Sequence, residues 1–457
     1  MDCCSDICYD VLYRLPIDAK LLFLAKFLRL FTFGFLALIL IQYLTTFIGL
    51  TTEQVGTVFS FTLLSDALVS LIFTSNADLY GRRVVLISSS ILSVITGAIF
   101  ATQTNYLIIM ITAIVGVISP SGQEVGPFMA VEISSLSCVD SGIDRTRLFA
   151  YYNLCGSFAT AIGALTCGCL TDYLSEHYST TTSYKIVMLI YATIQIACIY
   201  IFYGLSPRIE VPEEKKIATE KNPITLFLGL HRSKLVVCQL SLLFMIDSFA
   251  GSFVFQSFIS EWFSLVYSTP ASTMGFVLFV CNIVAGISAL FAAKLAEKVG
   301  LVLTMVITHV PSNILLILVP LMPSEILSML LIVLRFCISQ MDVPTRNAYV
   351  IGVVCEDERS GASGVITIVR SLGASIGPSI AGKLLMYPST ANSIFYVSGT
   401  LKLIYDFLLL LSFNAVKPDM EIAVEKGGHE DATSDNRRSE GALSKWTSNE
   451  LTPIMKA

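Results

Sequence analysis

The sequence predicts an all-α membrane protein whose twelve transmembrane helices form two related six-helix bundles. Three features predict it: a very apolar composition, a series of long apolar segments, and sequence marks that recur in the same order in both halves. Of the 457 residues, 54% are hydrophobic and only 14% are charged, and the mean hydropathy is +0.74. Soluble proteins carry roughly 25% charged residues, so most of this surface is expected to face lipid.

Twelve apolar segments approach the length of about 20 residues that a helix needs to cross the hydrocarbon core. Helices are expected because an open sheet leaves backbone groups without partners in lipid, and the alternating pattern of a membrane barrel is absent. The expected spans are 20–47, 55–77, 84–103, 106–134, 148–170, 185–205, 234–259, 272–294, 299–321, 325–347, 361–385 and 393–414.

Lysine and arginine are concentrated in alternate loops. The loop after the second span contains Arg82 and Arg83, whereas 51–54, 103–106 and 388–393 contain no basic residue. Cytoplasmic loops carry an excess of Lys and Arg, so both termini and the middle loop are predicted to be cytoplasmic. The plasma membrane is favoured over an internal membrane. Termini on the same side require an even number of spans, as found.

A largely polar connector separates six spans from six. The predicted organisation is a cytoplasmic N-terminus at 1–19, a bundle at 20–205, a cytoplasmic linker at 206–233, a second bundle at 234–414 and a tail at 415–457. The tail is rich in Ser, Glu, Asp and Lys and is predicted to be disordered.

The two halves contain matching residues and short motifs in the same order, and the matching positions lie 214 to 219 residues apart. Asp78-x-x-Gly81 corresponds to Glu297-x-x-Gly300, Gln123-x-x-x-Pro127 to Gln340-x-x-x-Pro344, and Arg145, Gly163 and Gly168 to Arg359, Gly377 and Gly382. Repeated halves are typical of carriers in which one bundle moves against the other.

The segment SNADLYGRRVVL resembles the loop signature between the second and third helices of the major facilitator superfamily. The resemblance extends over the chain from the first to the twelfth expected span. It implies that Asp78, Gly81, Arg82 and Arg83 are the acid, turn glycine and basic pair of that motif, with Thr74 in place of its opening glycine. Such a cluster is expected to latch two helices in one conformation and release them in another. The alternative is a basic loop that only sets topology.

The resemblance also implies a solute cavity lined by the first, fourth, seventh and tenth helices. A charge in lipid costs at least about 2.5–3.5 kcal/mol and is a functional candidate by default. Each of the four helices carries candidates: Arg29, then Gln123 and Glu124, then Asp247, then Arg335 and Gln340. The alternatives are that these charges only neutralise one another, and that Arg29 snorkels to the membrane surface. Asp66 and Arg370 are expected to support conformational change.

The stretch 119–127 interrupts the fourth span with two prolines and two glycines. Proline removes a backbone hydrogen bond and kinks a helix, and the freed carbonyls are expected to face a cavity. The alternative is a kink that serves only in gating.

These features predict a secondary transporter of a small organic solute that works by alternating access and is driven by protons, with Glu124 or Asp247 as the proton carrier. Efflux is favoured because aromatic and methionine residues flank Asp247; the alternatives are an uptake symporter for a nutrient or organic anion, and a non-transporting sensor. A Walker loop, a metal-ligand cluster and a nucleophile–base set are absent, so no enzyme, cofactor, metal or nucleic-acid partner is predicted. The protein is expected to be a monomer in a lipid bilayer.

Overall fold

The computed structural model describes residues 15–116, 118–124, 126–139, 145–210, 230, 233–354 and 358–413. Within these ranges the side chains of 71, 74–76, 78–79, 145–147, 180 and 360 are not described. The described residues form helices and short connections, with no strand among them. The predicted tail and most of the predicted linker lie outside the described residues.

The first six spans are α2 (Ile17–Thr46), α3 (Thr52–Tyr80), α4 (Arg82–Thr102), the pair α5 (Tyr106–Val115) and α6 (Phe128–Cys138), α7 (Arg145–His177) and α8 (Thr180–Tyr203). A short helix, η1 (Pro207–Ile209), follows α8. The other six spans are α11 (Lys234–Gly251) with η2 (Ser252–Val254) and α12 (Gln256–Tyr267), α13 (Ala271–Val299), α14 (Leu301–Leu318) with η3 (Val319–Leu321), α15 (Glu325–Ser339) with α16 (Asp342–Val353), α17 (Arg359–Leu385) and α18 (Ser393–Phe413).

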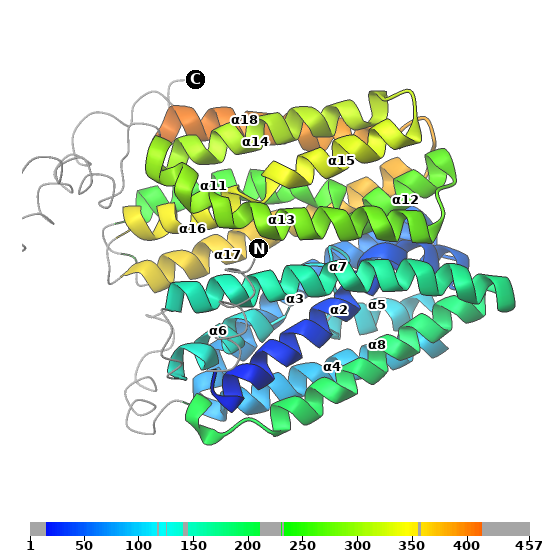
Figure 1. Ribbon diagram of the computed structural model, residues 1–457, viewed down its shortest axis with the longest axis horizontal. Helices are drawn as coiled ribbons and strands as arrows, with labels where there is room; N and C mark the ends of the chain where they lie inside the picture. The colour runs from blue at the N-terminus through cyan, green and yellow to red at the C-terminus, as the bar shows by residue number, and fades with distance from the viewer. Residues whose placement is uncertain are drawn as a thin grey trace, which may run out of the picture. The chain divides into compact units, whose positions relative to one another are not determined.

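The predicted fold class is confirmed. Ten of the described helical segments are long and apolar enough to cross a membrane. The apolar helices α5 and α6 together make the fourth span, and the 29-residue helix α3 completes the set of twelve. Figure 1 shows α2 to α8 on one side and α11 to α18 on the other, and α7 packs against α13 where the groups meet. The exact domain limits and the cytoplasmic side stay predictions.

Glycine turns join the second span to the third and the eighth to the ninth. Gly81 has φ 105° and Gly300 has φ 88°, a region that residues with a side chain rarely adopt. Each glycine ends one helix and begins the next within a single residue. These glycines are the corresponding marks of the two sequence repeats, so the repeat produces the same turn in both halves.

Three spans are interrupted. In the fourth, the described residues between Val115 and Phe128 are not helical, the seventh changes to a short 3₁₀ turn at η2, and the tenth breaks at Gln340 and Met341. Broken helices in transporters place free backbone groups near the bilayer midplane. The fourth-span break was expected from its prolines and glycines, but it is a loop of several residues rather than a kink.

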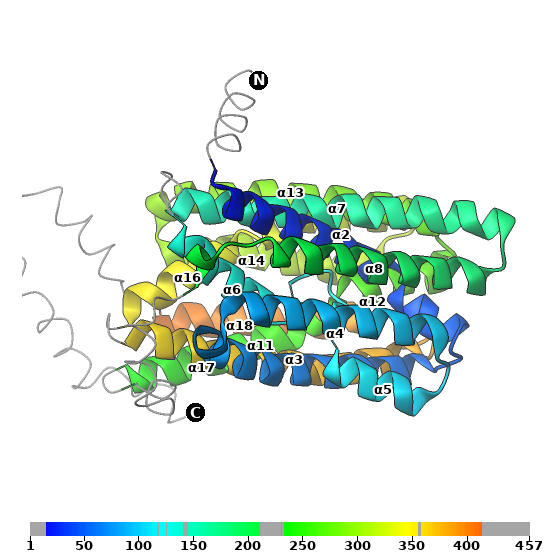
Figure 2. The ribbon, with the colours of Figure 1, turned by 90° about the horizontal axis from the view of Figure 1, so that it is seen from below.

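The two bundles touch at the end of the molecule that carries the α2–α3 and α17–α18 connections, here called the α2–α3 end. Small residues bring backbones together there: a Cβ on Gly275 of α13 would lie 2.6 Å from the Ala164 carbonyl oxygen of α7. A Cβ on Gly382 of α17 would overlap the carbonyl oxygen of Thr52 in α3. Figure 2 shows α3 beside α17.

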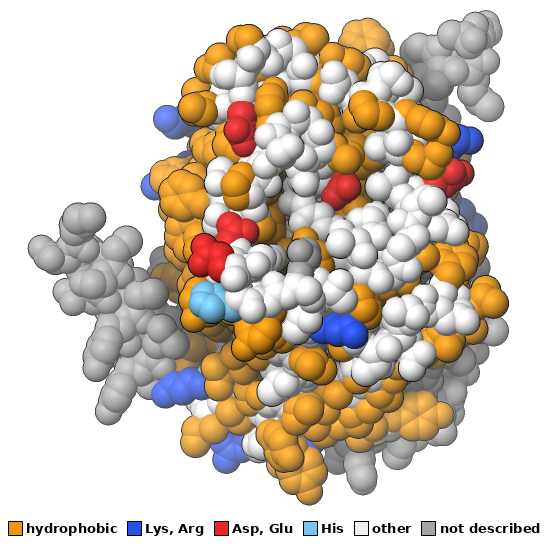
Figure 3. All heavy atoms as spheres, turned by 90° about the vertical axis from the view of Figure 1, so that its right-hand side faces the viewer, with side chains coloured by type: hydrophobic (Ala, Val, Ile, Leu, Met, Phe, Trp, Pro, Cys, Tyr) orange, Lys and Arg blue, Asp and Glu red, His pale blue; other side chains and the backbone are white. Residues whose placement is uncertain are grey.

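Hydrogen bonds also cross between the bundles near this end. Ser379 of α17 donates its backbone N–H and its hydroxyl to Ser60 Oγ of α3, at 3.0 and 2.8 Å. The backbone N–H of Ser272 donates to Asp172 Oδ2 at 3.0 Å, and Ser260 of α12 donates to the Leu38 carbonyl at 3.0 Å. Figure 3 views this end, where apolar and uncharged atoms cover most of the surface. The bundles are therefore in close contact at the end predicted to face away from the cytoplasm.

Gly382→Ala should weaken this contact, because the new methyl group would overlap backbone atoms, and backbone atoms cannot relieve the overlap by a change of rotamer. Overpacking of this kind costs about 1–3 kcal/mol, so the apparent melting temperature of the purified protein should fall. Gly364→Ala on the same helix is the matched control, since a Cβ there would meet nothing within 4 Å. Equal melting temperatures for the two variants would contradict the packing described here.

Candidate functional site

A buried group of charges lies at mid-depth in the first bundle. Lys26 and Arg29 of α2 meet Glu124, from the open segment of the fourth span, and Glu132 of α6. Arg29 Nη1 and Nη2 donate to the two carboxylate oxygens of Glu132 at 2.6 and 2.7 Å, and Nη2 also contacts Glu124. Lys26 Nζ lies 2.7 Å from Glu124 Oε2. These four residues, with Tyr152, are called the N-terminal charge cluster.

The N-terminal charge cluster pairs its two cations with two carboxylates. Tyr152 of α7 donates its hydroxyl to Glu132, and its ring lies 3.9 Å from Lys26 Nζ. Arg29 and Glu132 have no exposed surface. Arg29 is twelve residues into α2, about 18 Å from its start at 1.5 Å per residue. Its guanidinium is thus held by carboxylates inside the bundle and does not reach the membrane surface.

The backbone of the broken fourth span places Glu124 beside α2. Gly122 and Gly126 have φ 71° and 78°, so the chain turns where other residues would be strained. Pro127 is the N-cap of α6. The carboxylate of Asp66 in α3 accepts a hydrogen bond from the Gly126 N–H, so it satisfies a backbone group that the break leaves without a helical partner.

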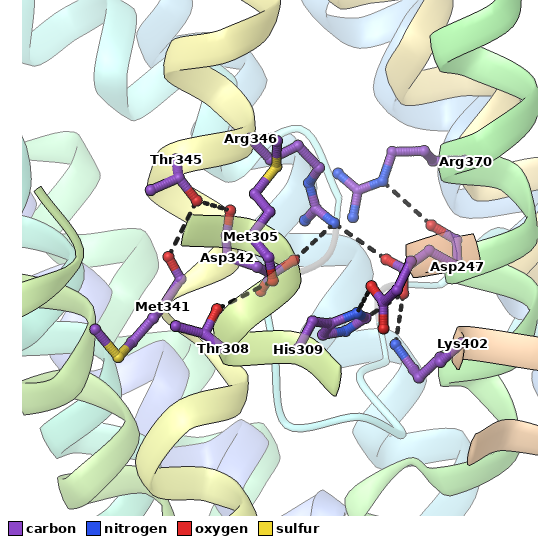
Figure 4. Close-up of polar contacts among 12 residues, drawn as sticks. Asp247, Met305, Thr308, His309, Met341, Asp342, Thr345, Arg346, Arg370 and Lys402 are labelled. Atoms are coloured by element: carbon purple, nitrogen blue, oxygen red, sulfur yellow. Dashed lines mark hydrogen bonds and ion pairs between the residues drawn. The ribbon is translucent and has the colours of Figure 1, made fainter. Parts of the chain in front are cut away.

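A second group of charges lies in the other bundle, with Asp247 of α11 at its centre (Figure 4). Lys402 Nζ of α18 is 2.6 Å from Asp247 Oδ1, and Arg346 Nη1 of α16 is 3.1 Å from Asp247 Oδ2. The same Arg346 nitrogen is 3.2 Å from Asp342 Oδ2. These residues, with His309 and Asp406, are called the C-terminal charge cluster.

His309 of α14 lies between two carboxylates of the C-terminal charge cluster. Its Nδ1 is 2.7 Å from Asp406 Oδ1 of α18, and its Nε2 is 3.7 Å from Asp247 Oδ1. Asn313 Nδ2 donates to the other oxygen of Asp406 at 2.9 Å. Carboxylate, imidazole and carboxylate therefore follow one another across α11, α14 and α18.

Arg335 lies apart from these ion pairs. Its residue is 9% exposed, and among the described residues its guanidinium has no hydrogen-bond or ion-pair partner, with Nε buried and unpaired. The ring of Phe336 is 5.2 Å from its Cζ. Arg370 of α17 donates to the Ser248 hydroxyl at 3.2 Å. Gln340 is half-buried at the break of the tenth span, and Gln123 is exposed.

The predicted latch residues meet an acid that the motif does not contain. Glu210, just after η1, accepts the backbone N–H groups of Arg82 and Arg83 at 2.7 and 3.0 Å. Arg82 Nη1 also donates to the carbonyl oxygens of Ser134 and Ile209, at 2.9 and 3.1 Å. The side chain of Asp78 lies outside the described residues. The start of α4 is thus bound to the connector that follows α8.

Several residues of the two clusters and of the latch contact were not among the predicted site residues: Lys26, Glu132, Tyr152, His309, Lys402, Asp406 and Glu210. Most are charged residues inside predicted spans, which mark functional sites in membranes by default. Lys26 and Glu132 lie in the first and fourth expected spans, whereas His309 lies in the ninth, and Lys402 and Asp406 lie in the twelfth, for which no candidate was predicted. Glu210 lies in a polar connector, where nothing in the sequence distinguishes it.

The sequence profile of the Major Facilitator Superfamily matches residues 22–378 and 248–451. A relative from Saccharomyces cerevisiae, the uncharacterized membrane protein YJR124C, is 26% identical over 448 residues, covering 90% of this chain and 97% of that protein. Within the described residues, no group of three or more His, Cys, Asp or Glu side chains is placed to hold a metal ion.

Solved transporter structures share the fold. The nucleoside transporter NupG has a TM-score of 0.67 at 15% identity, with 86% of this chain and 98% of NupG covered. A D-xylose-proton symporter has a TM-score of 0.65 at 13% identity, covering 85% of this chain and 96% of that one. The profile match extends over most of the chain, and the chain belongs to the major facilitator superfamily.

Proposed function

We propose that this transporter moves a small organic solute by alternating access and is driven by protons. The observation that supports proton coupling is the series Asp247, His309 and Asp406, which connects three helices inside the second bundle. His309 is hydrogen-bonded to Asp406 through Nδ1, and its Nε2 lies 3.7 Å from Asp247. Chains of Asp, Glu and His within membrane helices are the usual proton relays of pumps and transporters.

Asp247 can link protonation to movement because it holds two cations from different helices. When the carboxylate is charged, it binds Arg346 of α16 and Lys402 of α18. A proton on Asp247 removes the negative charge from both contacts. The attraction between α11 and its two neighbours then weakens, and His309 provides a path for the proton to Asp406.

The contacts between the bundles support alternating access. At the α2–α3 end the bundles meet through glycine backbones and serine hydroxyls, which separate without breaking an ion pair. The fourth, seventh and tenth spans are interrupted between these contacts and the opposite end. Rocking of the two bundles would open the first end and close the other.

Efflux remains the proposed direction. Phe244 and Phe253 flank Asp247 in the sequence, and both are buried rather than lipid-facing, at 0% and 1% exposure. The ring of Phe244 lies 5.5 Å from the Arg346 guanidinium. An apolar wall beside a charged group suits amphipathic compounds. Uptake of a nutrient would use the same elements, with the solute and the proton moving in the same direction.

A sensor on the same fold is the second candidate function. It would have no need of a titratable series that crosses three helices of one bundle. Flux separates the two candidates: proteoliposomes that contain a pH-sensitive dye would be screened with a library of solutes. Solute-dependent proton movement supports the carrier, and its absence from protein that is folded and correctly inserted supports the sensor.

Asp247→Asn should abolish proton-driven transport, because it fixes a neutral side chain beside Arg346 and Lys402. Removing one partner of a buried ion pair costs about 3–5 kcal/mol, so folding must be checked by gel filtration and thermal unfolding. Glu124→Gln should also reduce transport, since it removes a carboxylate shared by Lys26 and Arg29. Glu176→Gln, at an exposed acid outside both clusters, is the control. Full transport by folded Asp247→Asn protein would contradict the proposal.

His309→Gln should separate proton coupling from solute movement. Glutamine keeps a hydrogen bond to Asp406 but cannot relay a proton to Asp247. Uphill transport driven by a pH gradient should therefore be lost, while exchange of labelled for unlabelled solute at equal pH should remain. His177→Gln, at an exposed histidine, is the control. Parallel loss of exchange and uphill transport would assign His309 a structural role instead.

Glu210→Gln should loosen the start of α4, because a carboxylate at a helix N-terminus stabilises the unpaired N–H groups there. Loss of such a cap costs about 0.5–2 kcal/mol. Amides in the first turn of α4 should exchange faster with deuterium, and the transport rate should change with them if the latch is functional. Unchanged exchange in this turn would show that Glu210 does not hold the helix end.

A further inference from the structure

We propose that the solute is a small organic anion and that Arg335 binds its carboxylate or phosphate group. The proposal rests on the transport function proposed above for its physiological meaning. The binding site itself can be tested without measuring flux.

Arg335 differs from the other buried arginines of the two bundles. Arg29 is held by two glutamates, and Arg346 by two aspartates. Arg335 is also buried, yet the described residues supply no carboxylate or carbonyl oxygen to its guanidinium. An isolated charge in an apolar environment is costly and is normally paired with another group. A ligand that carries the missing negative charge explains why an arginine is placed there.

Arg335 is also at the depth expected of a solute site. It is ten residues after Glu325, the first residue of α15, so it lies about 15 Å from the start of that helix. This is half of a hydrocarbon core of about 30 Å. The break of the tenth span follows five residues later, at Gln340. Only 9% of Arg335 is exposed, so its side chain faces the interior of the bundle and not the lipid.

The guanidinium group selects the chemical class of ligand. It is planar and offers its N–H donors in a fork that matches the two oxygens of a carboxylate or phosphate. It cannot accept a hydrogen bond, so it provides nothing for an ammonium group. Amines and neutral amides of the same size should therefore bind more weakly than the matching acid.

The test uses thermal unfolding of the full chain in nanodiscs of phosphatidylcholine, a lipid without net charge. Matched probes differ only in charge: benzoate, benzamide and benzylamine form one series, and glycerol 3-phosphate and glycerol form another. The anions should raise the apparent melting temperature of the wild-type protein, and their neutral and cationic analogues should not. Arg335→Gln should abolish the shift, Arg335→Lys should retain part of it, and Arg208→Gln, at an exposed arginine, should leave it unchanged.

A second measurement does not depend on the choice of probe. If Arg335 has no counter-ion in the empty protein, Arg335→Gln removes an uncompensated charge and should leave the melting temperature unchanged or raise it. Arg29→Gln, which breaks an ion-pair network, should lower it. A fall for Arg335→Gln as large as that for Arg29→Gln would show that Arg335 is a structural cation and would overturn the proposal. Equal stabilisation by the neutral probes, or no stabilisation by any anion, would also overturn it.

The two proposals fail in different ways. Anion binding that depends on Arg335, without any flux of the bound anion in proteoliposomes, would leave the site intact and refute the transport function. Flux of neutral or cationic solutes that persists in Arg335→Gln would support transport and refute the anion site.

Discussion

The structure depends on one constraint: a charge inside the bilayer has no water to solvate it, so the protein must supply a counter-charge. In the first bundle, Arg29 of α2 is held by carboxylates of the fourth span. In the second, Asp247 is held by cations of α16 and α18. Each contact joins helices far apart in the sequence. Charged residues are few in this sequence, and the buried ones determine which helices are neighbours.

The same constraint applies to the backbone wherever a helix is broken. A helix that opens in lipid leaves N–H and carbonyl groups without partners, so a break must be accompanied by polar side chains. Asp66 binds the Gly126 N–H at the start of α6. The tenth span breaks beside Gln340, at the position that corresponds to Gln123 in the repeat. Helix breaks and buried polar residues thus occur together at mid-depth, where a solute would have to bind.

The sequence predicted the elements well and their pairings poorly. Spans were predictable because a run of about 20 apolar residues has few other stable forms, and Gly81 and Gly300 because sharp turns favour glycine. The interruption at 119–127 was predictable for the same local reason. The pairing of Lys402 with Asp247 was not, since 155 residues separate them and only the tertiary packing brings them to 2.6 Å. Nor does any local pattern show that Arg335 is left without a partner.

Strong and weak contacts are distributed in a way that suits movement between the bundles. The ion pairs of the two charge clusters each lie within a single bundle, with Arg29 in one and Asp247 in the other. Between the bundles the contacts described above are glycine against carbonyl, serine against serine or a carbonyl, and the Ser272 N–H against the Asp172 carboxylate, and none of these is an ion pair. Ion pairs within a bundle keep it rigid, because each broken pair would leave a bare charge. The bundles can therefore separate as units, and an unpaired Arg335 inside one of them remains available to a charge that arrives from outside.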